Sequence, residues 1–141
     1  MLTFSSLTLK AQTLNFEETV KYIKDKIECC SSSGGLVLES ITETGRITFS
    51  QGYVFDIFDW VKIDNDLNYL EQNTYENGTR VLSVDDNQLI VYKWATVYGS
   101  QYFRIETYVL TFKTPSDAEK VCNAFKHLKT LCTPEVDPFG N

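Results

Sequence analysis

The fold is decided by two adjoining segments, Tyr102-Phe103-Arg104-Ile105-Glu106-Thr107-Tyr108-Val109-Leu110-Thr111-Phe112 and Thr114-Pro115-Ser116-Asp117. The first segment is aromatic and β-branched with polar residues interleaved, which suits a half-buried strand. In the second, the Thr114 hydroxyl can accept hydrogen bonds from the open amides of a helix start. Pro115 fits the first helical position, where no N–H is needed. The sequence therefore predicts a long strand that runs straight into a helix.

The predicted helix carries one apolar stripe. Apolar residues recur at spacings of three and four, which places them on one helical face: Ala118, Val121, Phe125, Leu128 and Cys132. Pro134 cannot continue a helix and marks its end. A striped helix of this kind is expected to pack against a sheet.

A second helix is predicted near the start of the chain. Asn15 and Glu18 have the spacing of a capping box, in which each side chain bonds the other's backbone amide. The residues that follow form a narrow apolar seam at spacings of four and three: Phe16, Val20, Ile23, Ile27 and Cys30. This helix must also lie on another element.

The chain between the two helices reads as strands. Alternating or β-branched segments are predicted at 36–41, 46–50, 53–63, 79–84, 88–98 and 102–112, with a bend near Phe58-Asp59-Trp60 and a polar loop at 64–78. The short links Glu43-Thr44-Gly45, Asp85-Asp86-Asn87 and Gly99-Ser100 predict hairpins. In the segment 53–63, Phe55, Ile57, Val61 and Ile63 alternate on one face. The expected fold is α+β: an N-terminal helix, a six- to seven-stranded, strongly bent antiparallel sheet or barrel, and a C-terminal amphipathic helix.

Composition excludes several classes of partner. The chain has 141 residues, a formal charge of -6 and a pI near 4.7. Nucleic-acid binding needs clustered basic residues, and the 13 Lys and Arg here are scattered. No apolar run approaches the roughly 20 residues that span a bilayer. We therefore expect no nucleic acid and no membrane insertion, and a protein or small apolar ligand as the partner.

The first residues have two interpretations. Residues 1–12 are either an N-terminal strand or the remnant of an export signal, with an apolar stretch from Leu2 to Leu9 and small Ala11 at its edge. No basic residue precedes the apolar part, which departs from the usual signal. We expect an exported chain, periplasmic or extracellular, over a cytoplasmic one. Residues 13–133 then form a single domain, and 134–141 a flexible tail.

This pattern of strands closed by one helix resembles the pleckstrin-homology-like barrel. The segment Val109–Lys120 resembles the final strand and helix start of such domains. The later segment Ala124–Cys132 also resembles the ending of uncharacterised bacterial domains of this size. The resemblance implies that the last helix plugs the open end of a bent sheet. Lipid-binding members use basic residues on their first hairpin, where this chain has only Arg46 beside Glu39 and Glu43, so phosphoinositide binding is not implied.

No constellation of catalytic or metal-binding residues is apparent. His127 is the one histidine, and it lies on the last helix between lysines, where a surface position is expected. The acidic segment Asp64-Asn65-Asp66-Leu67-Asn68 lacks the glycine and the glutamate of a calcium loop. We therefore predict that the protein is not an enzyme and holds no metal and no cofactor.

The four cysteines leave two alternatives open. In an exported protein, Cys29 or Cys30 bridges Cys122 or Cys132 and staples the two helices. In a reducing compartment, Cys30, Cys122 and Cys132 are small buried apolar residues. Their spacing does not fit a zinc site.

An aromatic face is the candidate partner surface. Tyr92, Trp94 and Tyr98 alternate on one face of a strand, and Tyr102 follows the turn. The opposite face, Leu89, Val91, Ala95 and Val97, would fill the barrel. The rings either form an exposed patch for a partner or pack under the N-terminal helix.

The expected function is that of a non-enzymatic interaction domain that contacts a protein partner. The alternative is a carrier that holds a small apolar ligand between sheet and helix.

Overall fold

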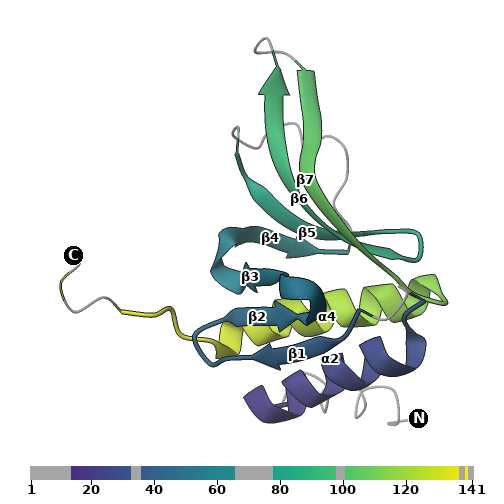
Figure 1. The fold of residues 1–141 in the computed structure, drawn as a ribbon, viewed down its shortest axis with the longest axis vertical. Helices are drawn as coiled ribbons and strands as arrows, with labels where there is room; N and C mark the ends of the chain where they lie inside the picture. Colours follow the sequence, from purple (N-terminus) through teal and green to yellow (C-terminus); the bar gives the residue numbers. More distant parts are fainter. Residues whose placement is uncertain (1–13, 33–35, 66–77, 98–100, 137–138, 140–141) are drawn as a thin grey trace, which may run out of the picture.

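The structure, a computed structural model, describes residues 14–32, 36–65, 78–97, 101–136 and 139. It is an α+β domain (Figure 1). Along the chain, the strands follow an N-terminal helix and precede a C-terminal helix, and in space the two helices pack against each other. The elements are α2 (Phe16–Cys30), β1 (Leu38–Ile41), β2 (Arg46–Phe49), the 3-10 turn η1 (Ser50–Gly52), β3 (Val54–Asp56), the 3-10 turn η2 (Ile57–Asp59), β4 (Trp60–Asp64), β5 (Arg80–Asp85), β6 (Gln88–Val97), β7 (Gln101–Thr111) and α4 (Pro115–Leu131).

Both predicted helix starts are confirmed. In α2 the Asn15 side chain accepts from the Glu18 amide at 2.8 Å, and the Glu18 carboxylate accepts from the Asn15 amide at 3.1 Å. In α4 the Thr114 hydroxyl accepts from the Asp117 amide at 3.1 Å. These bonds satisfy amides that the helix itself leaves open. The stripe predicted for α4 is buried in full.

The strands divide into two sheets. One is antiparallel with the order β1-β2-β3, and the other has the order β4-β5-β6-β7. Gly45 makes the β1–β2 turn with a φ of +92°, as its place in the link predicted. The β5–β6 turn also lies where it was expected: Asp86 has a φ of +55°, and the Asn87 side chain donates to the Phe112 carbonyl at 2.8 Å.

The prediction of one antiparallel sheet or barrel is wrong, because the described strands form two sheets and the second sheet is mixed. β4 pairs with β5 in parallel, and the strands of the described residues do not close into a barrel. Parallel neighbours need a connection of about a dozen residues or more. Residues 65–79 supply that length between Asp64 and Arg80. The links predicted as hairpins do join antiparallel pairs, which are β1–β2, β5–β6 and β6–β7.

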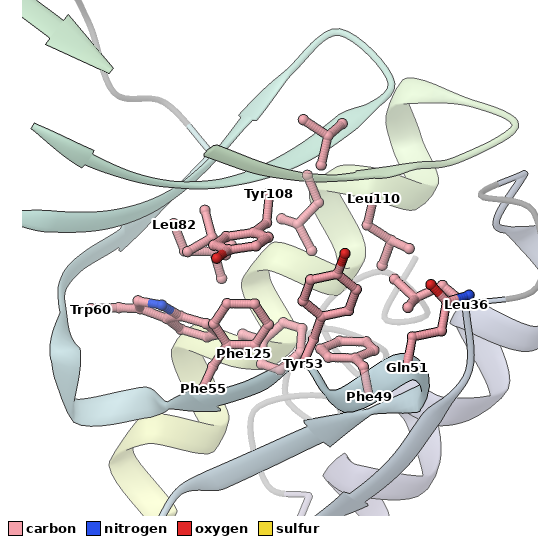
Figure 2. Close-up of a pocket in the computed structure, with 13 residues that line it drawn as sticks. Leu36, Phe49, Gln51, Tyr53, Phe55, Trp60, Leu82, Tyr108, Leu110 and Phe125 are labelled. Atoms are coloured by element: carbon pink, nitrogen blue, oxygen red, sulfur yellow. The ribbon is translucent and has the colours of Figure 1, made fainter. Parts of the chain in front are cut away.

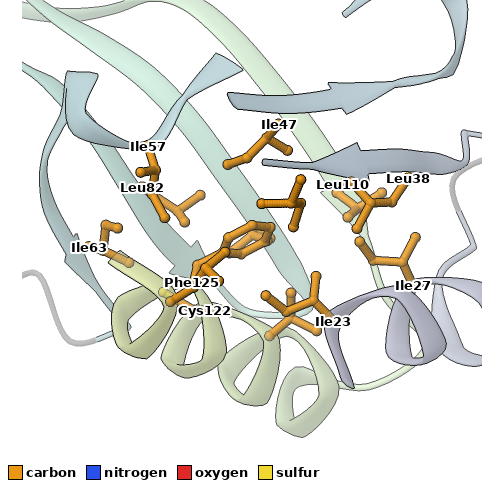
Figure 3. Close-up of a cluster of buried hydrophobic side chains, with 14 of the residues drawn as sticks. Ile23, Ile27, Leu38, Ile47, Ile57, Ile63, Leu82, Leu110, Cys122 and Phe125 are labelled. Atoms are coloured by element: carbon orange, nitrogen blue, oxygen red, sulfur yellow. The ribbon is translucent and has the colours of Figure 1, made fainter. Parts of the chain in front are cut away.

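The main core lies where the helices meet the strands. α2 packs beside α4 and touches β1, and α4 also contacts β4, β5 and β6. Ile23 and Ile27 of α2 and Phe125 and Cys122 of α4 belong to one buried cluster below the strands (Figure 3). The predicted apolar seam of α2 therefore packs against other elements of the fold, which are α4 and β1.

Some expectations concern parts of the chain outside the description. The strand or export signal predicted within residues 1–12, most of the loop at 64–78 and the Gly99-Ser100 turn lie outside the described residues. Residues 133–136 are exposed and follow α4 away from the body (Figure 1). Among the described helices, neither is long and apolar enough to cross a membrane.

Candidate functional site

A cavity of about 390 Å³ lies between the two sheets, above helix α4. Figure 2 shows its wall of side chains, with Trp60 at one end and Leu36 and Gln51 at the other. Its described lining is aromatic or aliphatic apart from Gln51. The aromatic members are Phe49, Tyr53, Phe55, Trp60, Tyr108 and Phe125, and the aliphatic ones are Leu36, Leu82, Leu89, Val91, Val109 and Leu110.

Strand register builds one wall of this pocket. Leu82 of β5 pairs with Val91 of β6, and Val91 pairs with Tyr108 of β7. Leu89 and Leu110 form the neighbouring pair. Residues that pair across strands, and those two apart along one strand, share a face of the sheet. These five side chains therefore present one continuous apolar surface.

Aromatic rings cross the pocket from the first sheet to the second. The Tyr108 ring lies 5.3 Å from that of Phe55 and 5.5 Å from that of Tyr53, both edge to face. Phe55 also contacts Trp60 at 6.0 Å, and Trp60 contacts Phe125 of α4 at 5.7 Å. These centroid separations are favourable for aromatic pairs. The rings form a chain that leads from Tyr53 to the helix below.

The two ends of this aromatic chain differ in exposure. Trp60 and Phe125 are 2% and 1% exposed, whereas Tyr53 and Tyr108 are 41% and 42% exposed. Tyr53 and Tyr108 therefore mark the mouth. Gln51 is exposed beside it, with a φ of +67° in η1, and Gly52 follows at +85°. A left-handed φ is uncommon for a residue with a side chain, and such residues cluster at ligand sites.

The bend at η2 positions Trp60. The Asp56 carboxylate accepts from the Phe58 amide at 2.9 Å, and the Trp60 amide bonds the Ile57 carbonyl. Lys129 of α4 donates to the Trp60 carbonyl at 2.5 Å. The bend was predicted near these residues, but the exposure of Val61 was not. Val61 is 67% exposed, because the register of β4 against β5 shifts between Trp60 and Lys62 and takes Val61 off the inward face.

The described lining offers little for catalysis. Its polar side-chain groups are the amide of Gln51, the hydroxyls of Tyr53 and Tyr108 and the indole N–H of Trp60, with no carboxylate, imidazole, thiol or amine among them. Across the described residues, no group of three or more His, Cys, Asp or Glu could hold a metal ion. The arrangement can bury an apolar molecule and offer it a few neutral hydrogen bonds.

The aromatic face proposed from the sequence is not exposed at Tyr92. This side chain is 1% exposed, because β5 and β6 are central strands buried on both faces. Trp94 and Tyr102 lie in β6 and β7, but the structure does not describe their side chains, and Tyr98 lies outside the described residues. Leu89 and Val91 of the opposite face do point inward, as expected, and line the pocket.

The cysteines do not form the staple between the helices that was one of the two alternatives. Cys29 and Cys30 are joined to each other by a disulfide, and Cys122 and Cys132 are buried free thiols. The end of α2 meets the start of α4, where the Lys113 amide bonds the Cys30 carbonyl at 2.8 Å. Cys122 and Cys132 lie further along α4. Burial raises the pKa of the Cys122 thiol to about 12, which keeps it protonated and unreactive.

His127 and the acidic segment also take structural roles. The His127 ring lies with Nε2 2.7 Å from the Leu14 carbonyl oxygen, so it joins α4 to the residue before α2. It is partly buried, not on the open surface. The Asn65 side chain donates to that of Asn123 of α4 at 3.1 Å. The rest of the acidic segment, residues 66–68, lies outside the described residues.

The pocket residues were not singled out from the sequence. Tyr53, Phe55 and Trp60 were predicted only as strand residues, and Tyr108 only as part of the long strand. The available signal was the concentration of rings in Tyr53-Val54-Phe55-Asp56-Ile57-Phe58-Asp59-Trp60. Which rings face one another depends on the bend at η2 and on the meeting of two sheets, and neither follows from residue spacing.

Comparison of the chain with family models, with curated proteins and with solved structures finds no match. The chemistry of the pocket itself therefore carries the functional argument.

Proposed function

We propose that the protein is a non-catalytic binding domain that holds a small apolar molecule in the pocket between its two sheets. The observation that carries this proposal is the cavity of about 390 Å³ with a lining made almost wholly of apolar side chains. Small-molecule sites usually measure about 300–1,000 Å³ and combine apolar walls with a few polar groups. The lack of a general base or nucleophile in the described lining favours binding over catalysis.

The size of the pocket sets the expected affinity. A ligand the size of an aromatic side chain buries about 150–250 Å². At about 25 cal/mol per Å² this gives roughly 4–6 kcal/mol before the losses of association. Before those losses, this corresponds to dissociation constants from tens of micromolar to about millimolar, so simple probes are expected to bind no more tightly than tens of micromolar.

Titration with N-phenyl-1-naphthylamine, an uncharged fluorescent probe, tests the proposal. We expect its emission to rise and saturate as it enters the pocket. Val91→Trp places a large ring within the lining and should weaken binding at least tenfold. Val61→Trp is the matched control, because Val61 lies on β4 with 67% of its surface exposed and does not line the pocket.

Two outcomes would reject the proposal. The first is a wild-type chain that gives no saturable signal. The second is a folded Val91→Trp variant that binds the probe as well as the wild-type chain does. Circular dichroism and urea unfolding of both variants show whether the insertion has damaged the fold.

A second candidate is the interaction domain that we expected from the sequence. It is favoured by the exposed apolar rim of the same pocket, formed by Tyr53, Tyr108 and Val109, each more than 40% exposed. Exposed apolar groups that gather at one place are typical of contact sites. Tyr53→Ser with Val109→Ser would then abolish association with a partner, whereas Val91→Trp, which fills the pocket and leaves the exposed rim in place, would retain it.

The likeness to pleckstrin-homology-like domains stays a proposal alongside this one. It is supported by the position of α4, whose Phe125 closes the space between the sheets from below. It adds no ligand to the argument, because fold alone does not specify function.

A further inference from the structure

We infer that the ligand of this pocket is an uncharged aromatic compound with a single ring or two fused rings and a neutral hydrogen-bonding group. This inference rests on the proposed function, since it specifies the class of apolar molecule that the pocket takes. Four features carry it: the orientation of the rings, the volume, the absence of charge in the described lining and the polar groups near the mouth.

The ring contacts favour an aromatic ligand over an aliphatic one. Tyr53, Tyr108 and Phe55 pair edge to face, with interplanar angles of 69° and 76°. In such a pair the edge of one ring meets the face of the other, so a further ring can extend the same pattern. An aromatic pair gains stability beyond its buried area, which a saturated ring of the same shape does not.

The volume limits the size of the ligand. At about 390 Å³ the cavity is near the lower end of the range for small-molecule sites. It suits a compact ring system and not a long acyl chain. The deep end is formed by Trp60 and Phe125, which contact each other and are almost fully buried. The ring system is expected to lie against them and to reach Phe55 and Tyr108.

The charge of the surroundings argues for a neutral ligand. No charged side chain is among the described residues that line the pocket, and the whole chain carries a formal charge of -6. An unpaired charge buried among rings would lose its hydration without compensation. A neutral hydroxyl or amide can instead bond Gln51 or Tyr53 near the mouth, where both are exposed (Figure 2).

Competition between matched compounds tests the inference. With N-phenyl-1-naphthylamine bound, 2-naphthol and its saturated counterpart decahydro-2-naphthol are added as displacing ligands. Because aromatic pairs add to area burial, we expect 2-naphthol to bind about three- to tenfold more tightly. The anion 2-naphthoate should bind at least tenfold more weakly than 2-naphthol.

Variants locate the origin of the preference. Tyr108→Leu removes a ring that contacts both Tyr53 and Phe55 but keeps the wall apolar. It should reduce the preference for 2-naphthol to less than about twofold, with little change for decahydro-2-naphthol. Tyr22→Leu is the control, since it makes the same exchange on α2, away from the described lining of the pocket, and it should retain the preference.

The outcomes separate this inference from the proposed function. Equal or tighter binding of decahydro-2-naphthol, tighter binding of 2-naphthoate, or failure of 2-naphthol to displace a bound probe would overturn the inference and leave the proposed function standing. Absence of any saturable probe binding would overturn the proposed function, and this inference with it.

Discussion

The region between the helices and the region between the sheets are both apolar, but they are packed differently. On the helix side, aliphatic residues such as Ile23, Ile27, Val121 and Leu128 are at most 2% exposed and belong to one continuous cluster. Between the sheets, rings from both sides touch at their edges and enclose a cavity. The two regions adjoin, because pocket-lining residues such as Phe125, Trp60 and Leu89 also belong to that cluster.

The difference follows from side-chain shape and from what holds the walls. Branched aliphatic groups interlock at the density of protein interiors. Planar rings in edge-to-face contact hold two separate sheets apart and cannot fill the space between them. The helix side is therefore expected to supply stability, and the side between the sheets is available for a ligand.

The largest expected effect comes from truncating the same residue type in each region. Leu128→Ala removes a side chain that is 0% exposed and should lower the free energy of unfolding by about 3–5 kcal/mol. Leu89 borders the pocket, so Leu89→Ala removes fewer packing contacts and should lower the free energy of unfolding by about 2–3 kcal/mol. Urea unfolding followed by circular dichroism measures both. Equal costs would mean that the pocket wall is packed as tightly as the core.

A second effect on stability is expected where the turn of the first sheet supports the aromatic wall. A Cβ at Gly45 would stand 2.5 Å from Ile57 Cγ2, and the φ of +92° is strained for any side chain. Gly45→Ala should therefore cost about 1–2 kcal/mol for the backbone and about 1–3 kcal/mol for the overlap. Because Ile57 begins the turn that sets Trp60, probe binding should weaken as well.

Gly52→Ala is the control for the Gly45 variant. Its φ is +85°, but no atom lies within 4 Å of the added Cβ. Only the backbone cost of about 1–2 kcal/mol is expected. If the two variants lose the same stability, the close approach to Ile57 does not contribute.

Sequence patterns were sufficient where a single element determines the outcome. The capping residues Asn15 and Thr114 and the stripe from Ala118 to Cys132 follow from helical spacing alone, and the structure has each of them. The turn position of Gly45 could also be predicted, because a tight hairpin turn needs a residue with positive φ and glycine adopts that conformation most readily.

Patterns failed where two elements meet. The bend near Phe58 was predicted, but the alternation of Val61 with Ile63 was expected to continue after it, and the register shift between Trp60 and Lys62 leaves Val61 exposed. The parallel pairing of β4 with β5 depends on the path of a long connection, which residue types do not specify. The pocket depends on both, so its residues could be recognised as apolar but not as neighbours.

The smallest expected effect concerns the rim of the dense region, where α2 and α4 are joined by an ion pair. Lys26 Nζ lies 3.2 Å from Asp117 Oδ1, and their side chains are 24% and 16% exposed. The hydrogen bond from the Thr114 hydroxyl and the Lys26 ammonium lower the pKa of Asp117 below its usual value. The folded chain then binds fewer protons than the unfolded chain does just below pH 4. This contribution to stability is complete above about pH 4 and is lost as the pH falls through the lowered pKa.

Asp117→Asn should remove this pH dependence while keeping the shape of the side chain. We expect the variant to be less stable than the wild-type chain at pH 7 and to approach it as the pH falls below about 3. Asp25→Asn is the matched control, because its pair with Lys21 lies at 2.6 Å but both side chains are more than half exposed. An exposed pair within one helix contributes little, since solvent screens it. If Asp25→Asn changes the acid unfolding as much as Asp117→Asn does, the link between the helices is no stronger than a surface pair, and the dense region owes its stability to apolar packing alone.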